Sequence, residues 1–163
     1  MIDDFTQKLI IEQSLIGRVI TQATTVEAII NAYIAEYYTR CPNGNYQQSY
    51  LTFISDVMNE QSVSLYAKIN ILYKIHTHMY GTSVPKVTKK LFEDWLSVRN
   101  KIAHGQYIAD QGILYRGEIF DVQELTDKHA KLQLSISAKL ESWAELRGPY
   151  FAHIPIKPPQ NNW

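Results

Sequence analysis

Apolar side chains recur at helical spacing along most of this 163-residue chain, and that periodicity restricts the folds open to it. The segments that carry such a stripe are residues 3–39, 50–58, 65–80, 86–104 and 121–147. A helix with one apolar side buries that side against other elements, and helices joined by short connections pack antiparallel. The sequence therefore predicts an all-α fold, an antiparallel bundle of four to five helices.

Residues that favour helix starts and stops separate these segments. Pro85 suits a first helical turn, and Gly81 suits a left-handed C-terminal cap. Within the longest segment, Thr24 and Glu27 have the spacing of a capping box, in which the threonine begins a helix. That segment is therefore predicted to be either two helices that meet near residues 23–25 or one continuous, bent helix.

The pattern changes after residue 106. Three β-prone triplets, residues 107–109, 113–115 and 118–120, are separated by short turn-forming stretches that contain glycine. Asp121 and Glu124 then have the spacing of a cap for the last helix. We therefore expect a small antiparallel β-hairpin insertion, of two or three short strands, before the last helix.

Composition and charge narrow the classes of function. The chain is 45% hydrophobic and 20% charged, as expected for a globular protein, and its formal net charge is zero. A neutral chain lacks the overall positive field of many nucleic-acid-binding proteins, so any RNA contact has to be local. The length suits one domain, predicted at residues 1–147, followed by an extended, proline-rich tail at residues 148–163.

The sequence also predicts a cytoplasmic protein with no membrane segment. Cys41 is the only cysteine, which is compatible with a reducing compartment. The first residues are acidic, whereas a signal peptide begins with a basic region. No apolar run approaches the roughly 20 residues that a membrane-spanning helix needs.

The segment 86–104 ends with a charged group in an unusual place. With about 100° of rotation per residue, Arg99 projects into the apolar arc of its helix, between Trp95 and Phe92. A guanidinium keeps its charge and needs hydrogen-bond acceptors when it is desolvated. Asn100 and His104 project together on the opposite flank, with His104 about 140° from the arginine.

Arginine and histidine together suffice for the cleavage of RNA without a metal. Histidine can take a proton from a ribose 2′-hydroxyl or return one to the leaving oxygen, because imidazole titrates near neutral pH. Arginine can hold a phosphate through two hydrogen bonds and stabilise the charge that develops on it. On spacing alone, the pair is a weak signal that occurs by chance in many proteins. Composition alone favours a structural role, in which Arg99 pairs with a carboxylate and His104 caps its helix.

The angle between the two side chains adds a geometric condition. Groups about 140° apart on an ideal helix do not converge easily on one phosphate. We therefore expect either that the helix unwinds at Gly105 or that a second copy of the chain supplies the opposing arginine and histidine. In the second case, Phe92, Trp95 or Leu96 should lie near the contact between the two copies.

The run from Arg99 to His104, RNKIAH, late in a helical bundle, closely resembles the motif of the HEPN superfamily. That motif is an arginine, often followed by a polar residue, and then a histidine after four to six residues. The resemblance implies a metal-independent endoribonuclease without a cofactor, acting as a homodimer whose motifs face each other across a cleft. It assigns the scissile phosphate to Arg99, general acid or base catalysis to His104, and an orienting role to Asn100.

Many HEPN relatives are toxins or phage-defence nucleases, often paired with a nucleotidyltransferase-like antitoxin, so the resemblance implies such a setting here. One toxin subgroup has a tyrosine two residues after the histidine, where this chain has Gln106, with Tyr107 one place later. We expect Lys101 and Tyr107 to contact the RNA substrate. Lysines along the same helix could add a local basic patch, or they could be an ordinary solvated face.

Two other functions remain compatible with the sequence. Some HEPN domains cleave nothing and serve as RNA-binding or dimerisation modules, and in that case Arg99 would anchor an interface. A nucleotide-binding cleft is a third, weaker interpretation.

Overall fold

The computed structural model describes residues 3–39, 46–59 and 63–145, and the predicted tail lies outside them. Its helices are α1 (Asp4–Thr39), α2 (Tyr46–Phe53), a short π-helix (Ile54–Met58), α3 (Leu65–Tyr80), α4 (Lys86–His104) and α5 (Val122–Glu145). Its strands are β1 (Gln106–Ile108), β2 (Gly112–Tyr115) and β3 (Glu118–Phe120). The prediction of a helical bundle with a small β insertion before the last helix is confirmed.

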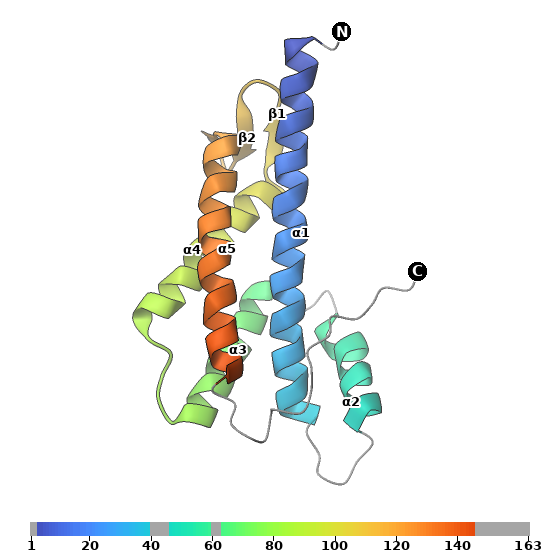
Figure 1. The fold of residues 1–163 in the computed structure, drawn as a ribbon, viewed down its shortest axis with the longest axis vertical. Helices are drawn as coiled ribbons and strands as arrows, with labels where there is room; N and C mark the ends of the chain where they lie inside the picture. Colours follow the sequence, from blue (N-terminus) through green and yellow to red (C-terminus); the bar gives the residue numbers. More distant parts are fainter. Residues whose placement is uncertain (1–2, 40–45, 60–62, 146–163) are drawn as a thin grey trace.

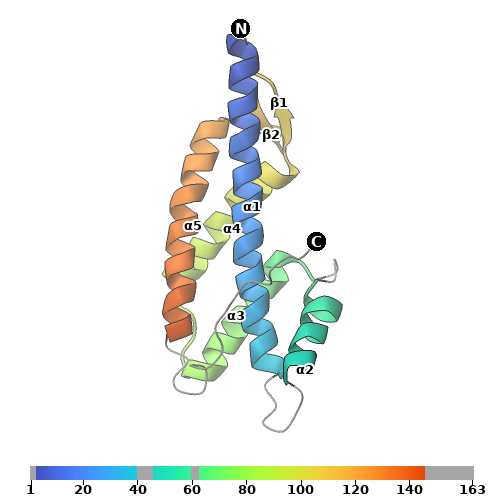
Figure 2. The ribbon, with the colours of Figure 1, turned by 45° about the vertical axis from the view of Figure 1, so that its right-hand side comes forward.

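Helix α1 spans the length of the molecule, and α5 lies beside it in both ribbon views (Figures 1 and 2). Helix α4 packs against both, antiparallel to α5, while α3 packs against the C-terminal half of α1 (Figure 1). The sheet lies at the end of the bundle that contains the N-terminus of α1 (Figure 1). None of the helices in the described ranges has both the length and the apolarity to cross a membrane.

Helix α1 is continuous, so the alternative of two helices meeting near residues 23–25 is wrong. The Thr24 hydroxyl donates to the carbonyl oxygen of Ile20 at 3.0 Å, and Thr21 and Thr25 make the same type of bond to the carbonyls four residues before them. A threonine hydroxyl that bonds backwards inside a helix is not available to cap a new one. The capping-box spacing was therefore coincidental.

The helix ends predicted at Gly81, Pro85 and Asp121 are confirmed, while the predicted end near residue 147 lies outside the described residues. Gly81 adopts a left-handed φ of 67° after α3, and Pro85 immediately precedes α4. At the start of α5, the main-chain N–H of Glu124 donates to Oδ1 of Asp121 at 2.8 Å. Ser64 caps α3 in the same way, by accepting a hydrogen bond from the N–H of Ala67.

The insertion is a three-stranded antiparallel sheet in the order β1-β2-β3 rather than a single hairpin. Tyr107 pairs with Ile113, and Ile113 pairs with Phe120, which fixes the register of all three strands. Ile113 is buried beneath the sheet and faces the helices. The sheet therefore covers one end of the bundle and continues the chain directly from the end of α4.

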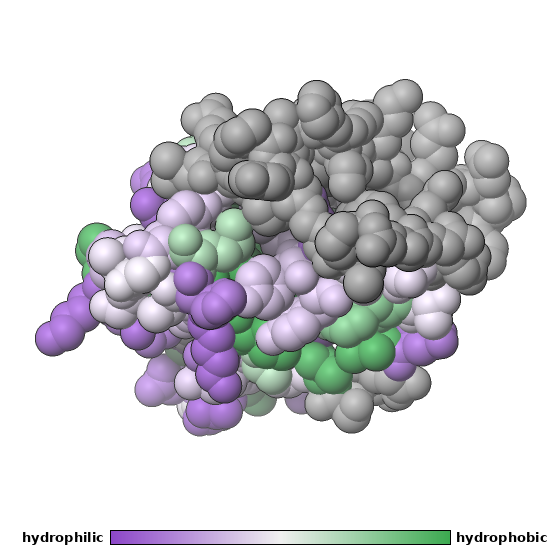
Figure 3. Space-filling model, turned by 90° about the horizontal axis from the view of Figure 1, so that it is seen from below, coloured by the Kyte–Doolittle hydropathy of each residue, from purple (hydrophilic) through white to green (hydrophobic). Residues whose placement is uncertain are grey.

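Buried apolar residues form two clusters. The larger cluster fills the space between α1, α3, α4 and α5 and includes Ile30, Phe92, Trp95 and Trp143. Figure 3 views the bundle from the end opposite the sheet, where hydrophobic side chains (green) reach the surface between polar ones (purple). The smaller cluster lies under the sheet, where it joins the end of α4 to α1 and α5.

Candidate functional site

The motif occupies the last two turns of α4, and the helix ends at the predicted glycine for a steric reason. Gly105 has an extended backbone (φ −77°, ψ 155°), not the left-handed one common at helix ends. A Cβ atom at this position would overlap the side chain of Ile113 and the carbonyl oxygen of Lys101. Glycine thus allows β2 to lie against the helix end, immediately after His104.

The structure brings Arg99, Asn100 and His104 together within a single chain. Nη1 of Arg99 lies 3.1 Å from Oδ1 of Asn100 and 3.3 Å from Nε2 of His104. Of the two expected routes, the chain does leave the helical conformation at Gly105, and the long arginine side chain spans the remaining angle to His104. The second route, a second copy of the chain, stays a prediction. Since guanidinium nitrogens only donate, Nε2 of the histidine acts as the acceptor in this contact.

Arg99 is half-buried and has no acidic partner among the described residues. The ion pairs within the described ranges are formed by lysines and do not include Arg99. The alternative in which Arg99 pairs with a carboxylate is therefore not found there. Its Nε atom is buried and lacks a hydrogen-bond partner there. His104, by contrast, is exposed. The imidazole of His104 thus faces solvent at the helix end, with Nη1 of the half-buried Arg99 beside it.

Lys101 and Tyr107, the two predicted substrate-binding residues, contact other parts of the chain. The Lys101 ammonium lies 3.7 Å from the centre of the Phe120 ring, a cation–π contact with β3. The Tyr107 hydroxyl donates to Glu12 on α1. That hydrogen bond, with burial, raises the pKa of Tyr107 to about 12. Both side chains thus fasten the sheet, and neither joins the group around Arg99.

The apolar residues near the motif are in the core. Phe92 and Trp95 are 1% and 0% exposed, so the prediction that a contact between two copies lies near one of three residues is wrong for these two. For Leu96, which is half-buried against the large cluster, it stays a prediction. Helical periodicity showed that Phe92 and Trp95 face inward, but it did not distinguish a neighbouring helix from a second chain. Trp95 instead donates to Gln133 on α5, at 2.9 Å.

Sequence reasoning missed His129, which lies on α5 next to this region. It is fully buried, its ring lies 6.2 Å from that of Trp95, and neither ring nitrogen has a partner among the described residues. Burial lowers the pKa of His129 to about 4, so its ring is neutral at physiological pH. Its position four residues after Leu125, on the apolar stripe of α5, was the signal that could have placed it inside.

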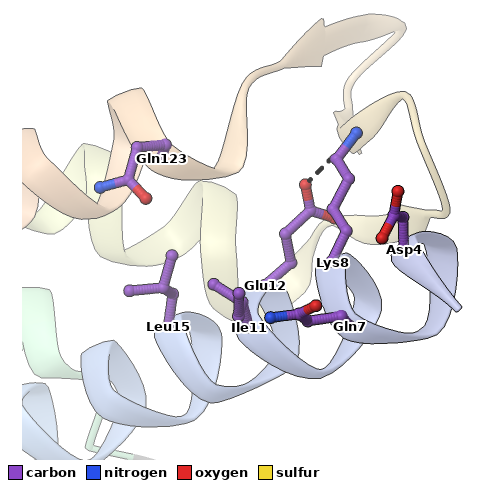
Figure 4. A pocket seen from close by; sticks show the side chains of 7 residues that line it. All are labelled: Asp4, Gln7, Lys8, Ile11, Glu12, Leu15 and Gln123. Atoms are coloured by element: carbon purple, nitrogen blue, oxygen red, sulfur yellow. Dashed lines mark ion pairs between the residues drawn. The ribbon is translucent and has the colours of Figure 1, made fainter. Parts of the chain in front are cut away.

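A separate cleft of about 400 Å³ lies between the first turns of α1 and the start of α5 (Figure 4). Its lining is Asp4, Gln7, Lys8, Ile11, Glu12, Leu15 and Gln123. Lys8 and Glu12 form an ion pair of 3.9 Å across one turn of α1, and Lys8 also reaches Asp110 at 3.3 Å. Its lining includes none of the predicted site residues, and the hydrogen bond between Glu12 and Tyr107 links it to one of them.

Within the described ranges, no group of three or more His, Cys, Asp or Glu side chains is arranged to hold a metal ion. No family model, curated protein or solved structure matches the chain. The likeness to the HEPN superfamily therefore depends on the residues of the motif and on the helical plan.

Proposed function

We propose that this protein is a metal-independent endoribonuclease of HEPN type that cleaves RNA at the Arg99–His104 pair. The observation that carries the proposal is the 3.3 Å contact between Nη1 of Arg99 and Nε2 of His104 at the exposed end of α4. The same guanidinium nitrogen also donates to Oδ1 of Asn100, at 3.1 Å. A hydrogen-bond donor for the phosphate, Arg99, and a group that can transfer protons, His104, thus lie close enough to act on one phosphodiester.

The reaction uses the 2′-hydroxyl of the RNA as the nucleophile. The unprotonated His104 takes the 2′-hydroxyl proton while the 2′-oxygen attacks the adjacent phosphorus, and the P–O5′ bond breaks. The products are a 2′,3′-cyclic phosphate and a 5′-hydroxyl, whose oxygen receives a proton from an imidazolium. Arg99 donates to the non-bridging oxygens and stabilises the charge that develops on them in the transition state.

One imidazole cannot remove one proton and supply the other at the same moment. A homodimer would solve this problem, because a second His104 could act as the acid while the first acts as the base. We therefore include the homodimer in the proposal, together with a cytoplasmic toxin–antitoxin or phage-defence setting and a nucleotidyltransferase-like antitoxin. The motif resemblance supports these parts.

The test incubates the purified protein with tRNA and mRNA in EDTA. We expect the wild type to produce fragments with 2′,3′-cyclic phosphate ends, and His104→Ala and Arg99→Ala to lose cleavage by at least about 10²-fold. Because His104 is exposed, His104→Ala should keep the melting temperature of the wild type. Equal cleavage by wild type and His104→Ala would show that the nuclease is a contaminant and would contradict the proposal.

The main alternative is a non-catalytic module for RNA binding or dimerisation. One observation favours it: Arg99 already contacts Asn100 and His104 in the same chain, which is also how a purely structural arginine closes a helix end. In that case RNA stays intact, while Arg99→Ala weakens RNA binding or self-association. Gel-shift assays and analytical ultracentrifugation on the same variants distinguish the two functions.

A further inference from the structure

Trp95 fixes the register between α4 and α5. Its indole N–H donates to Oε1 of Gln133, and the amide nitrogen of Gln133 donates to the carbonyl oxygen of Gln22 on α1, at 3.1 Å. The two helices are antiparallel (Figure 1). Arg99 lies one helical turn from Trp95 on α4, in the direction of the sheet. His129 lies one turn from Gln133 on α5, in the same direction. This register places position 99 of α4 at the level of position 129 of α5, next to the contact of 6.2 Å between the rings of Trp95 and His129.

Arg99 and His129 both have a buried polar atom without a partner among the described residues. In Arg99 it is Nε, whose N–H can only donate, and in His129 it is each of the two ring nitrogens. A buried donor or acceptor without a partner is costly, so such atoms are nearly always paired, often through an ordered water. A donor on one helix and an acceptor at the same level on the next can satisfy each other through such a water.

The ring of His129 is in the right protonation state for this role. It is 0% exposed, and the burial that lowers its pKa to about 4 leaves it neutral, with one nitrogen able to accept. Thr126, buried one turn earlier on α5, donates its hydroxyl to the carbonyl oxygen of Gln123. That bond uses the hydroxyl hydrogen of Thr126, so Thr126 does not donate to the imidazole.

We infer that His129 is a positioning residue for Arg99: through one buried water, its ring nitrogen accepts from the Nε–H and so directs Nη1 towards His104. This inference rests on the proposed function of the Arg99–His104 pair. A guanidinium held by α5 at Nε and by Asn100 and His104 at Nη1 is fixed before RNA binds. Donors that are already oriented stabilise the transition state without first having to reorganise.

The test follows the side-chain Nε–H of Arg99 by ¹H–¹⁵N NMR on the full chain labelled with ¹⁵N-arginine. The chain has five arginines, and Arg99→Lys assigns the resonance. We expect this N–H to exchange with solvent at least about tenfold more slowly than that of the exposed Arg18. In His129→Leu the difference should disappear, while in His129→Gln, whose amide oxygen can accept, it should remain.

A matched control is His76→Leu. His76 packs between Tyr80 and Trp143 near the end of the bundle away from the sheet, so its loss should leave the exchange of Arg99 unchanged. Protection of Arg99 that survives in a folded His129→Leu protein would overturn the inference. So would fast exchange in the wild type, a measurement that needs no variant and therefore decides even if His129→Leu does not fold.

RNA cleavage gives the second readout. We expect His129→Leu to lower kcat by about 10- to 100-fold with a smaller change in KM, and His129→Gln to recover most of the rate. An increase in KM at unchanged kcat would contradict a positioning role. If the wild type cleaves no RNA, the proposed function fails, while the exchange measurement still decides whether His129 holds Arg99.

Discussion

The two apolar clusters of this protein differ in composition and in what they hold in place. The large cluster contains the big aromatic side chains, with Phe92 stacked on Trp143 at 6.0 Å and in edge contact with Tyr73 at 5.8 Å. The buried residues of the small cluster are all aliphatic: Val19, Val98, Ile102, Ile113, Val122 and Leu125. Burial of large aromatic rings contributes most to the stability of a core. The large cluster therefore determines whether the bundle folds.

The small cluster determines where the motif lies. Val98 and Ile102 lie on the same turns of α4 as Arg99, and Ile113 presses against the helix end at Gly105. Changes in this cluster should move the site with modest loss of stability, whereas changes in the large cluster should unfold the protein. The predictions below test that division.

The largest expected effect is in the large cluster. Phe92→Ala removes a ring that is 1% exposed and should lower the free energy of unfolding by about 3–5 kcal/mol, through lost burial and the cavity left behind. Urea denaturation followed by circular dichroism measures it. The control is Leu134→Ala, which truncates a side chain that is 74% exposed and should change stability by less than about 0.5 kcal/mol. Equal effects would mean that Leu134 is covered by a partner in solution.

The next largest effect is the pH dependence of stability that His129 causes. This residue lies on α5 between Leu125 of the small cluster and Ile136 of the large one. Its folded pKa of about 4 is below the 6.5 of an ordinary histidine. As the pH falls through 6.5 the unfolded chain binds a proton that the folded chain does not, so stability should drop by about 3 kcal/mol between pH 6.5 and pH 4. His129→Leu should remove this part of the pH dependence.

Urea denaturation of both proteins at pH 7, 6 and 5 measures that difference. Burial also lowers the pKa of His76, but this group is present in both proteins, so subtracting the two curves cancels it. Parallel curves would mean that His129 binds a proton as readily in the folded chain as in the unfolded one.

Alanine substitutions at two glycines should change stability by smaller amounts and in opposite directions. Only the first of them, Gly105→Ala, touches the small cluster. Gly105→Ala places a methyl group against Ile113 and the carbonyl oxygen of Lys101 and should cost about 1–3 kcal/mol. Gly17→Ala, at an exposed position of α1 with nothing within 4 Å of the new Cβ, should stabilise by about 0.5–1 kcal/mol. Thermal denaturation gives both values, and RNA cleavage should fall only in Gly105→Ala.

If Gly105→Ala cleaved RNA at the wild-type rate, the placement of β2 against the helix end would not matter for the site. The argument that the small cluster positions the motif would then be wrong.

Much of the fold followed from the sequence because local signals and periodicity agreed. Gly81, Pro85 and Asp121 mark helix ends through backbone conformation or hydrogen bonds that depend on a few neighbouring residues. The error at Thr24 has the same origin, since the spacing of a capping box occurs by chance in a helix whose threonine hydroxyls bond backwards. Short-range patterns can indicate a cap without excluding a continuous helix.

The site was less predictable because its geometry depends on which elements meet. The angle of about 140° describes the directions in which the Arg99 and His104 side chains leave an ideal helix. It took no account of the length of the arginine side chain, which lets Nη1 reach the imidazole. The same angular argument placed Trp95 on an apolar face without revealing that α5 covers it. His129 attracted no attention, because a single histidine on an apolar stripe becomes informative only once its neighbours are known.

The smallest effect is expected at Tyr107, which packs against the small cluster and was predicted to bind substrate. Tyr107→Phe keeps the ring but removes the hydrogen bond to Glu12, which should cost about 1 kcal/mol because the pair is partly solvated. Glu12→Gln is the matched change on the other partner, and a double-mutant cycle by urea denaturation separates their coupling from their individual effects. If Tyr107 only fastens β1 to α1, both variants should cleave RNA with an unchanged KM. An increase in KM in Tyr107→Phe but not in Glu12→Gln would instead show that the hydroxyl contacts RNA, and the site would then extend from α4 across the sheet.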